Sequence, residues 1–172
     1  MFKWLFGKTR EQAAIGGGRD LLIVSRTVQA PVEGAFAAFV DRFNVWWPRD
    51  ATWGGDRLAE IGIEAKTGGR CFERTVDGAE SVWGTVLSVA RPSHIVLAWQ
   101  IRPDRTPEAN EAAASRVDVR FVETKPGTTE VVLVHRDFSR HGEGWEAYRT
   151  AMAAAKGWPR LMDLYAKAVA GG

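Results

Sequence analysis

Residues 80–101, ESVWGTVLSVARPSHIVLAWQI, decide the fold. In their second half every other residue is a large apolar one, namely Ile95, Leu97, Trp99 and Ile101. A period of two is typical of a strand with one buried face. The first half is also strand-like, with Trp83, Leu87 and Val89 on one face, and Arg91-Pro92-Ser93 separates the halves as a turn. The segment therefore predicts two consecutive antiparallel strands.

The same pattern extends in both directions from this pair. We expect further strands at 21–29, 59–65, 70–75, 116–121 and 131–135. Asp77-Gly78 is a preferred dipeptide for a tight hairpin turn. Pro126-Gly127 fits a type II turn, with glycine at the position that needs a positive φ. Consecutive hairpins thus predict one antiparallel sheet.

Two segments are helical in pattern. After Ala30-Pro31, apolar side chains recur at helical spacing, at Phe36, Phe39, Val40, Phe43 and Trp47. The last quarter, 143–170, is interrupted at Gly157-Trp158-Pro159, where one helix can end and another begin. The order predicts an α+β fold in which the C-terminal helix covers the apolar face of a curved sheet. A pocket is expected between that sheet and that helix.

Composition and charge exclude several classes of protein. Of the 172 residues, 45% are hydrophobic and 26% are charged, which is typical of a globular chain. The net charge is +2, but residues 1–19 hold four basic residues against Glu11, so residues 20–172 carry −1. We therefore expect no nucleic-acid partner. No apolar run approaches the length of a membrane span.

Cysteine and motif content point to a reducing compartment and a protein without cofactors. Cys71 is the single cysteine, so it forms no internal disulfide, and it is expected to be a small buried hydrophobe. Together with the lack of a secretory signal, this predicts a cytoplasmic location. The sequence has no P-loop, no His-Glu-x-x-His pair and no nucleophile elbow, so we expect neither cofactor nor metal.

Residues 1–19 are expected to form a flexible leader ahead of a single domain at 20–172, because three glycines (16–18) separate the two. Phe2, Trp4, Leu5 and Phe6 lie close together in this leader. They indicate either an anchor for a membrane surface or partner, or a terminus that frays or packs on its own domain.

Many separated motifs match a known family in order. They are Ala30-Pro31-Val32-Glu33, Trp46-Trp47-Pro48, Gly68-Gly69-Arg70-x-Phe72-Glu73-Arg74, Asp77-Gly78-x-Glu80-x-x-Trp83-Gly84, Leu97-x-Trp99-Gln100-Ile101, Val117-x-Val119-x-Phe121, Leu133-x-His135 and Gly157-Trp158-Pro159. The chain resembles the SRPBCC (START, birch-pollen-allergen-like) superfamily from about residue 21 to 170. Within it, the chain is similar to the branch named after the activator of the Hsp90 ATPase. The resemblance implies a helix-grip fold, with seven strands, two short helices after strand one and a long C-terminal helix over a hydrophobic cavity.

Aromatic residues on the inward parity are the candidate ligand contacts. The expected pocket lining is Phe72, Trp83, Trp99, Phe121, Leu133, His135 and Trp158. For Trp83 and Trp99, packing in the core and contact with a flat apolar ligand are equally compatible with the pattern.

His135 and Glu73 are the candidates for chemistry. His135 shares the inward parity of Leu133, so it is either a hydrogen-bonded core residue or a general base or anchor for a polar ligand group. Glu73 pairs with it as an acid–base couple if the two approach each other, although a structural ion pair is equally compatible. The loop 102–115 is long enough to form a lid over a pocket or a mobile segment.

Three functional hypotheses follow. The leading one is a domain that binds a small hydrophobic molecule between sheet and terminal helix. The second is an interaction module of co-chaperone type, with a chaperone or other protein as partner. The third is a cyclase-like or hydrolase-like enzyme that uses His135 and Glu73.

Overall fold

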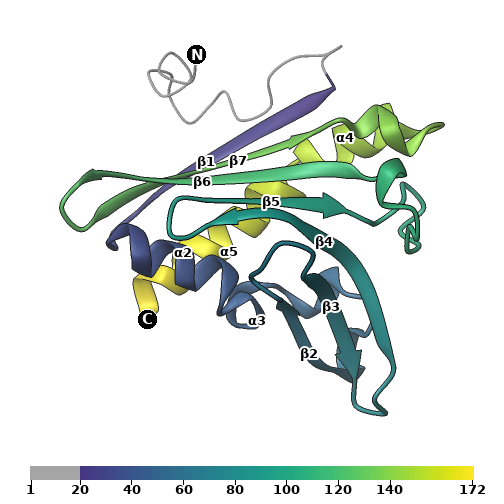
Figure 1. The fold of residues 1–172 in the computed structure, drawn as a ribbon, viewed down its shortest axis with the longest axis horizontal. Helices are drawn as coiled ribbons and strands as arrows, with labels where there is room; N and C mark the ends of the chain where they lie inside the picture. The colour runs from purple at the N-terminus through teal and green to yellow at the C-terminus, as the bar shows by residue number, and fades with distance from the viewer. Residues whose placement is uncertain (1–19) are drawn as a thin grey trace.

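The computed structural model describes residues 20–172. Seven strands form one antiparallel sheet in the order β1-β7-β6-β5-β4-β3-β2 (Figure 1). The strands are β1 (Leu21–Val28), β2 (Leu58–Ile63), β3 (Arg70–Thr75), β4 (Glu80–Ala90), β5 (His94–Trp99), β6 (Ser115–Lys125) and β7 (Thr128–Arg136). The expected α+β helix-grip architecture is confirmed. The expected leader, with Phe2 and Trp4, lies outside the described residues.

Four helices accompany the sheet within residues 20–172. Two short ones, α2 (Val32–Val40) and α3 (Phe43–Trp46), follow β1, and α4 (Trp145–Ala153) precedes α5 (Trp158–Gly171). Proline in the first turn of α5 suits a helix start, because its missing N–H has no helical partner there. The α5 helix runs across the concave face of the sheet (Figure 1) and packs against β1, α2, α3 and α4.

Alternating residues of the central strands build the core. Across four strands, Leu97, Val117, His135 and Leu22 lie in successive register and are all buried. The expected inward parity of 95–101, 117–121 and 131–135 is confirmed. Tyr165 of α5 closes this core and donates its hydroxyl to the Ala35 carbonyl at 2.8 Å.

Two irregularities in β4 change the phase expected from simple alternation. Trp83 is an extra residue opposite β3, and Leu87 is an extra residue opposite β5. Val86 is therefore fully buried, whereas Leu87 is only half-buried. The expectation that Trp83, Leu87 and Val89 share one regular face was wrong at Leu87, because each bulge inserts one residue and shifts the alternation.

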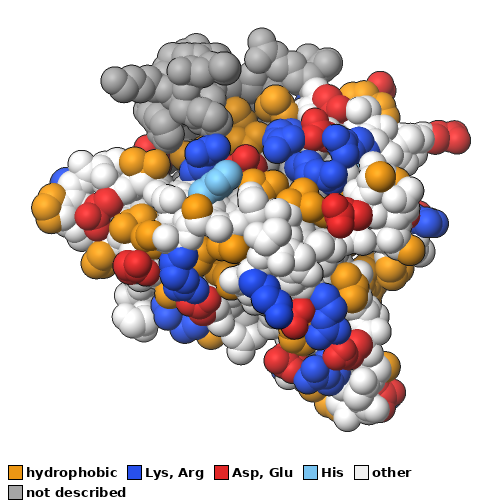
Figure 2. Space-filling model, viewed as in Figure 1, with side chains coloured by type: hydrophobic (Ala, Val, Ile, Leu, Met, Phe, Trp, Pro, Cys, Tyr) orange, Lys and Arg blue, Asp and Glu red, His pale blue; other side chains and the backbone are white. Residues whose placement is uncertain are grey.

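The outer face of the sheet carries charges of both signs. Figure 2 shows Lys and Arg side chains interspersed with Asp and Glu over β3 to β7. Cross-strand pairs account for this pattern: His94 contacts Asp118 at 2.7 Å, and Arg74 contacts both Glu60 and Glu80. Such pairs keep the outer face solvated while the inner face packs.

Candidate ligand-binding site

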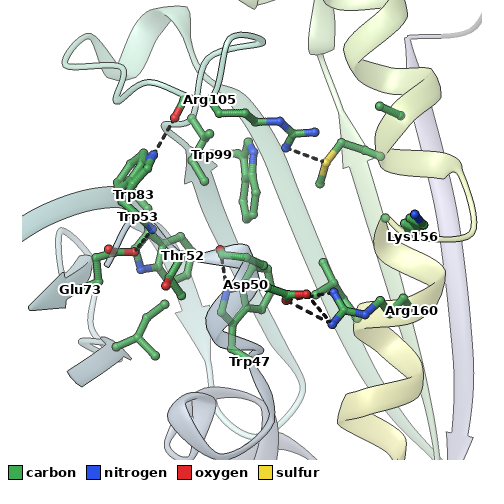
Figure 3. A pocket seen from close by; sticks show the side chains of 17 residues that line it. Trp47, Asp50, Thr52, Trp53, Glu73, Trp83, Trp99, Arg105, Lys156 and Arg160 are labelled. Atoms are coloured by element: carbon green, nitrogen blue, oxygen red, sulfur yellow. Dashed lines mark hydrogen bonds and ion pairs between the residues drawn. The ribbon is translucent and has the colours of Figure 1, made fainter. Parts of the chain in front are cut away.

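A pocket of about 450 Å³ lies between the β2–β5 part of the sheet and the start of α5. Figure 3 shows its residues: Glu73 and Trp83 stand on the sheet side, and Lys156 and Arg160 stand on the helix side. Its lining residues are Trp47, Asp50, Ala51, Thr52, Trp53, Ile61, Glu73, Trp83, Trp99, Ile101, Arg105, Ala151, Met152, Lys156, Gly157, Arg160 and Leu161. The lining thus combines an aromatic wall with a small set of charged groups.

Three buried indoles form the wall. Trp83 lies parallel to Trp47, with ring centroids 6.2 Å apart and an interplanar angle of 7°. Trp99 lies 5.9 Å from Trp83 at 64°. These geometries are offset or edge arrangements that aromatic pairs prefer. The pocket therefore has both a flat indole face and an indole set across it.

A glycine beside Trp83 makes this wall possible. Gly84 is paired with Trp99, and a Cβ there would lie 2.6 Å from the Ala98 carbonyl and 3.2 Å from Cβ of Cys71. Only glycine allows β4 to approach β3 and β5 this closely. The bulge then turns Trp83 inward next to Trp99 rather than away from it.

Trp83 and Trp99 differ in how their indole N–H groups are satisfied. Trp99 donates to the Tyr148 hydroxyl at 2.8 Å, and that hydroxyl donates to the Ile101 carbonyl at 2.9 Å. Burial raises the pKa of Tyr148 to about 12, so the phenol stays protonated. The Trp83 N–H is buried and has no acceptor in the part of the chain that the structure describes.

Glu73 places a carboxylate in the pocket wall. Its side chain is buried, and its two oxygens accept the backbone N–H groups of Gly54 at 2.6 Å and Trp53 at 3.2 Å. It forms no ion pair with any residue of 20–172. Charge-assisted hydrogen bonds of this kind hold the 52–55 loop against β3.

Two loops meet at the mouth. The indole N–H of Trp53 donates to the Arg105 carbonyl at 2.6 Å, which joins the 52–55 loop to the loop after β5. The Arg105 guanidinium lies 4.8 Å from the Tyr148 ring centroid and 3.5 Å from the sulfur of Met152. The 102–115 loop therefore contributes Arg105 to the pocket lining.

The helix side of the mouth is built by the turn between α4 and α5. Gly157 lies so close to α4 that a Cβ would be 2.3 Å from the Met152 carbonyl. This tight turn brings Lys156 and Arg160 to the pocket, and Arg160 contacts both carboxylate oxygens of Asp50 at 3.1 Å.

The structure brings only part of the expected residue set to this pocket. Trp83, Trp99 and Glu73 line it. Phe72 lies on the outer face of β3, between the guanidinium groups of Arg70 and Arg74 at 5.2 and 5.6 Å. Phe72 follows Cys71 and precedes Glu73 along one strand, so it points away from the pocket that Glu73 faces.

The other expected contacts are core residues. Phe121 packs edge-on against Phe36 and Phe39, and Leu133 and Trp158 are fully buried without lining the pocket. Phe121 and Leu133 have the expected inward parity but lie in the core, where Phe36 of α2 packs on Phe121, and Trp158 is the first residue of α5 itself.

His135 is a hydrogen-bonded core residue with both ring nitrogens engaged. Nδ1 accepts the indole N–H of Trp158 at 2.9 Å, and Nε2 lies 2.7 Å from Oγ of Ser115. Because Nδ1 accepts, the neutral ring carries its proton on Nε2 and donates it to Ser115. Burial lowers the pKa of His135 well below its ordinary value. No contact joins His135 to Glu73 in residues 20–172, so the expected acid–base couple is not assembled.

Cys71 is buried next to Gly84, as expected for a small hydrophobe, and burial raises the pKa of its thiol. Across residues 20–172 no helix is long and apolar enough to cross a membrane. In the same range no three His, Cys, Asp or Glu side chains come together as a metal site would require.

Sequence reasoning missed the residues of the mouth. Trp53, Arg105, Lys156 and Arg160 lie in loops or at a helix start, where no periodicity reveals which way a side chain points. Trp47 gave a usable signal, because it lies four residues after Phe43 and so continues the apolar stripe at helical spacing.

Two solved structures that are similar to this chain are more than a quarter identical to it. The anthrahydroquino-γ-pyrone synthase Txn09, solved in complex with a molecule designated SUM, is 29% identical with a TM-score of 0.62, over 86% of this chain and 96% of its own. CalC, a self-sacrificing resistance protein from Micromonospora echinospora, is 27% identical with a TM-score of 0.62, over 88% of this chain and 94% of its own.

A third structure shares the fold alone. Protein NE0264 from Nitrosomonas europaea is 12% identical with a TM-score of 0.63, over 91% of this chain and 97% of its own. No curated protein matches the sequence. The model of the family described as activator of Hsp90 ATPase homolog 1-like protein matches residues 29–170. The chain therefore belongs to the activator of Hsp90 ATPase homologue 1-like family, a branch of the SRPBCC superfamily.

Proposed function

We propose that this protein binds a planar aromatic small molecule in the tryptophan-lined pocket. The observation that carries the proposal is a pocket of about 450 Å³ walled by Trp47, Trp83 and Trp99, with Trp53 at its mouth. Ligand pockets are typically about 300–1,000 Å³, apolar and aromatic, with a few placed polar groups. Flat indole faces offer large apolar contact at little conformational cost, which favours flat ligands.

The name of one relative supports the same class of ligand. The name of Txn09 refers to an anthrahydroquinone, which is a fused aromatic ring system, and its structure holds a bound molecule. This chain shares 29% of its residues with that protein and covers nearly all of it. A pocket lined by four tryptophans suits a fused-ring molecule better than a flexible lipid chain.

Binding is tested with 2-(hydroxymethyl)anthraquinone, a neutral fused-ring probe, by quenching of tryptophan fluorescence. We expect saturable quenching, and Trp99→Leu is expected to weaken the affinity at least fivefold because it removes one wall. Trp145→Leu, outside the pocket, is the matched control. Absence of saturable quenching up to the solubility limit of the probe would refute the proposal.

A second candidate function is acid–base chemistry on the bound molecule, with Glu73 as the acting group. The favouring observation is that Glu73 is a buried carboxylate of the pocket wall without a basic partner in residues 20–172. His135 takes no part, since Ser115 and Trp158 occupy both of its nitrogens. In Glu73→Gln the side-chain amide oxygen still accepts one of the two loop N–H groups. If this variant turns over a substrate as fast as the unaltered protein does, Glu73 has no role in the reaction.

A co-chaperone role receives less support from the surface. The large apolar side chains that are exposed in residues 20–172 are Val45, Trp53, Val76 and Val122. They belong to α3, the 52–55 loop, the β3–β4 turn and β6. The β3–β4 turn and the β6–β7 hairpin lie at opposite ends of the molecule in Figure 1, so these side chains do not make one contiguous docking patch. A pull-down that captured the Hsp90 chaperone reproducibly would restore this alternative.

We further propose a cytoplasmic location, because the single cysteine is a free thiol. Fractionation of the source cells tests this, and recovery of the protein outside the cytoplasm contradicts it.

A further inference from the structure

The mouth of the pocket holds two cations that lack an acidic partner. Arg105 and Lys156 both line the pocket, and neither lies within 4.0 Å of a carboxylate in residues 20–172. The side chain of Lys156 is exposed, and the Arg105 guanidinium lies over the Tyr148 ring. Cations at a concave site attract anions more strongly than the same charges on a flat surface.

The two carboxylates of the pocket do not neutralise these cations. Asp50 is taken by Arg160, which contacts both of its oxygens. Glu73 is buried on the sheet side and accepts the N–H groups of Trp53 and Gly54. Residues 20–172 carry a net charge of −1. The mouth, with two positive charges that no carboxylate neutralises, is therefore more positive than the domain as a whole.

The backbone at Arg105 carries a further sign of a functional constraint. Its φ is +70°, in the left-handed region that favours glycine, and it is one of two such residues other than glycine in 20–172. Strain of this kind persists where the surrounding structure holds it, and it gathers at ligand sites. Here the bond from the Trp53 indole to the Arg105 carbonyl holds the backbone, and the side chain is directed to the pocket.

The two cations come from two different segments of the chain. Arg105 comes from the loop after β5, and its guanidinium reaches the sulfur of Met152 in α4, whereas Lys156 comes from the turn between α4 and α5. In Figure 3 the Arg105 guanidinium therefore lies on the side of the Trp99 indole that faces Lys156. A ligand whose rings rest on the indoles would therefore present its outer end to both cations. Arginine and lysine together suit a carboxylate or another oxyanion at that end.

We propose that the ligand is a planar aromatic acid, whose rings contact the tryptophan wall and whose anionic group contacts Arg105 and Lys156. This inference rests on the proposed function and adds the charge of the ligand to it. The anionic end stays at the mouth, because the buried Glu73 carboxylate would repel it from the sheet side of the pocket.

Three matched probes separate ring binding from charge recognition. They are anthraquinone-2-carboxylate, neutral 2-(hydroxymethyl)anthraquinone and cationic 2-(aminomethyl)anthraquinone, each titrated by tryptophan quenching at low salt. We expect the carboxylate to bind at least fivefold more tightly than the neutral probe and the amine to bind most weakly. The preference is expected to shrink in 0.5 M salt, because exposed charges are screened.

Variants assign this preference to the two cations. Lys156→Gln and Arg105→Gln are each expected to reduce the preference about two- to threefold, and the double variant is expected to abolish it. The affinity for the neutral probe should change less than the affinity for the carboxylate, and an unchanged urea midpoint shows that each variant is still folded. Lys167→Gln is the matched control, since it removes one exposed positive charge from α5 outside the pocket.

The outcomes distinguish the two proposals. Equal affinity for the carboxylate and the neutral probe overturns the inference about charge and leaves the aromatic ligand standing. A preference that survives in the double variant also overturns it, because other groups would then recognise the anion. Failure of all three probes to bind refutes the proposed function and this inference with it.

Discussion

Two ends of the same concave face are both lined by aromatic side chains, and only one is filled. At the packed end, Phe121 contacts both Phe36 and Phe39, and Phe39 contacts Tyr165 of α5, with ring centroids 5.2–5.8 Å apart. At the hollow end, Trp47, Trp53, Trp83 and Trp99 surround a pocket. The difference lies in what covers the sheet, since α2 and α5 cover the first and loops with helix ends cover the second. Loops close a cavity without filling it.

The largest expected effect is a difference in the free energy of unfolding between substitutions at the two ends. Phe39→Ala at the packed end removes a fully buried ring in contact with four aromatic neighbours, and we expect a loss of about 3–5 kcal/mol in the free energy of unfolding. Trp53→Ala at the mouth of the hollow end should cost less than half as much, because Trp53 is 36% exposed. Urea denaturation measures both. Similar losses would contradict the distinction.

Next in size is a pH dependence from two histidines outside the packed end, of which His135 contacts Trp99 and His141 contacts Tyr148. Burial holds the pKa of His135 and of His141 below their ordinary values. The folded state therefore takes up fewer protons than the unfolded state once the pH falls below about 6.5. Stability must fall as the pH is lowered through that value, with a slope approaching about 1.4 kcal/mol per pH unit for each histidine.

Urea denaturation between pH 7.5 and 5.5 tests this slope. His141→Gln should reduce it while leaving the His135 contribution, because glutamine keeps an acceptor for Ser115. Stability that is constant over this range, or that rises toward acid, would be incompatible with the buried neutral histidine.

A smaller effect distinguishes two tryptophans within the hollow end. Trp99→Phe and Trp83→Phe remove similar ring area, but only Trp99 loses a hydrogen bond, the one to the Tyr148 hydroxyl. Trp83→Phe removes a buried donor that has no acceptor in residues 20–172. A buried unsatisfied group costs about 1–3 kcal/mol, so Trp83→Phe should be less destabilising by about 1–2 kcal/mol. Equal losses in thermal or urea unfolding would count against this assignment.

The smallest expected effect is at the rim. Arg160 and Asp50 form an exposed ion pair, with side chains 38% and 67% accessible. Asp50→Asn should therefore change stability by less than about 1 kcal/mol. It should also leave Arg160 unpaired and raise the affinity for anthraquinone-2-carboxylate. A large loss of stability would show that the pair does more than shape the rim.

Most of the fold could be predicted from periodicity and turns. The alternation in 95–101, 117–121 and 131–135 identifies inward residues correctly, and Gly157-Trp158-Pro159 marks the start of α5. The phase of β4 could not be predicted, because each of its bulges adds one residue that leaves no mark in the alternation.

The site could be predicted only where strands build it. Trp83, Trp99 and Glu73 line the pocket as expected. Phe72 and Glu73 are neighbours in one strand, so alternation allows only one of them to face inward.

Whether the other residues line the site depends on which element covers the sheet above them, or on the course of a loop. Phe121 and Leu133 have the right parity, but parity does not reveal whether a helix or a cavity lies above a residue. Trp53, Arg105 and Lys156 come from loops and turns, whose course depends on contacts such as the bond from Trp53 to Arg105.

The central claim is that the hollow end, and not the packed end, receives the ligand, and indole ¹H–¹⁵N NMR tests it directly. The tryptophan N–H signals are assigned by substitution, and 2-(hydroxymethyl)anthraquinone is then titrated. We predict that the signals of Trp47, Trp53, Trp83 and Trp99 shift, while that of Trp46, which contacts Phe39 and Tyr165 and donates its N–H to the Phe39 carbonyl, stays in place. A shift concentrated at Trp46, or no shift at any indole, would contradict the account.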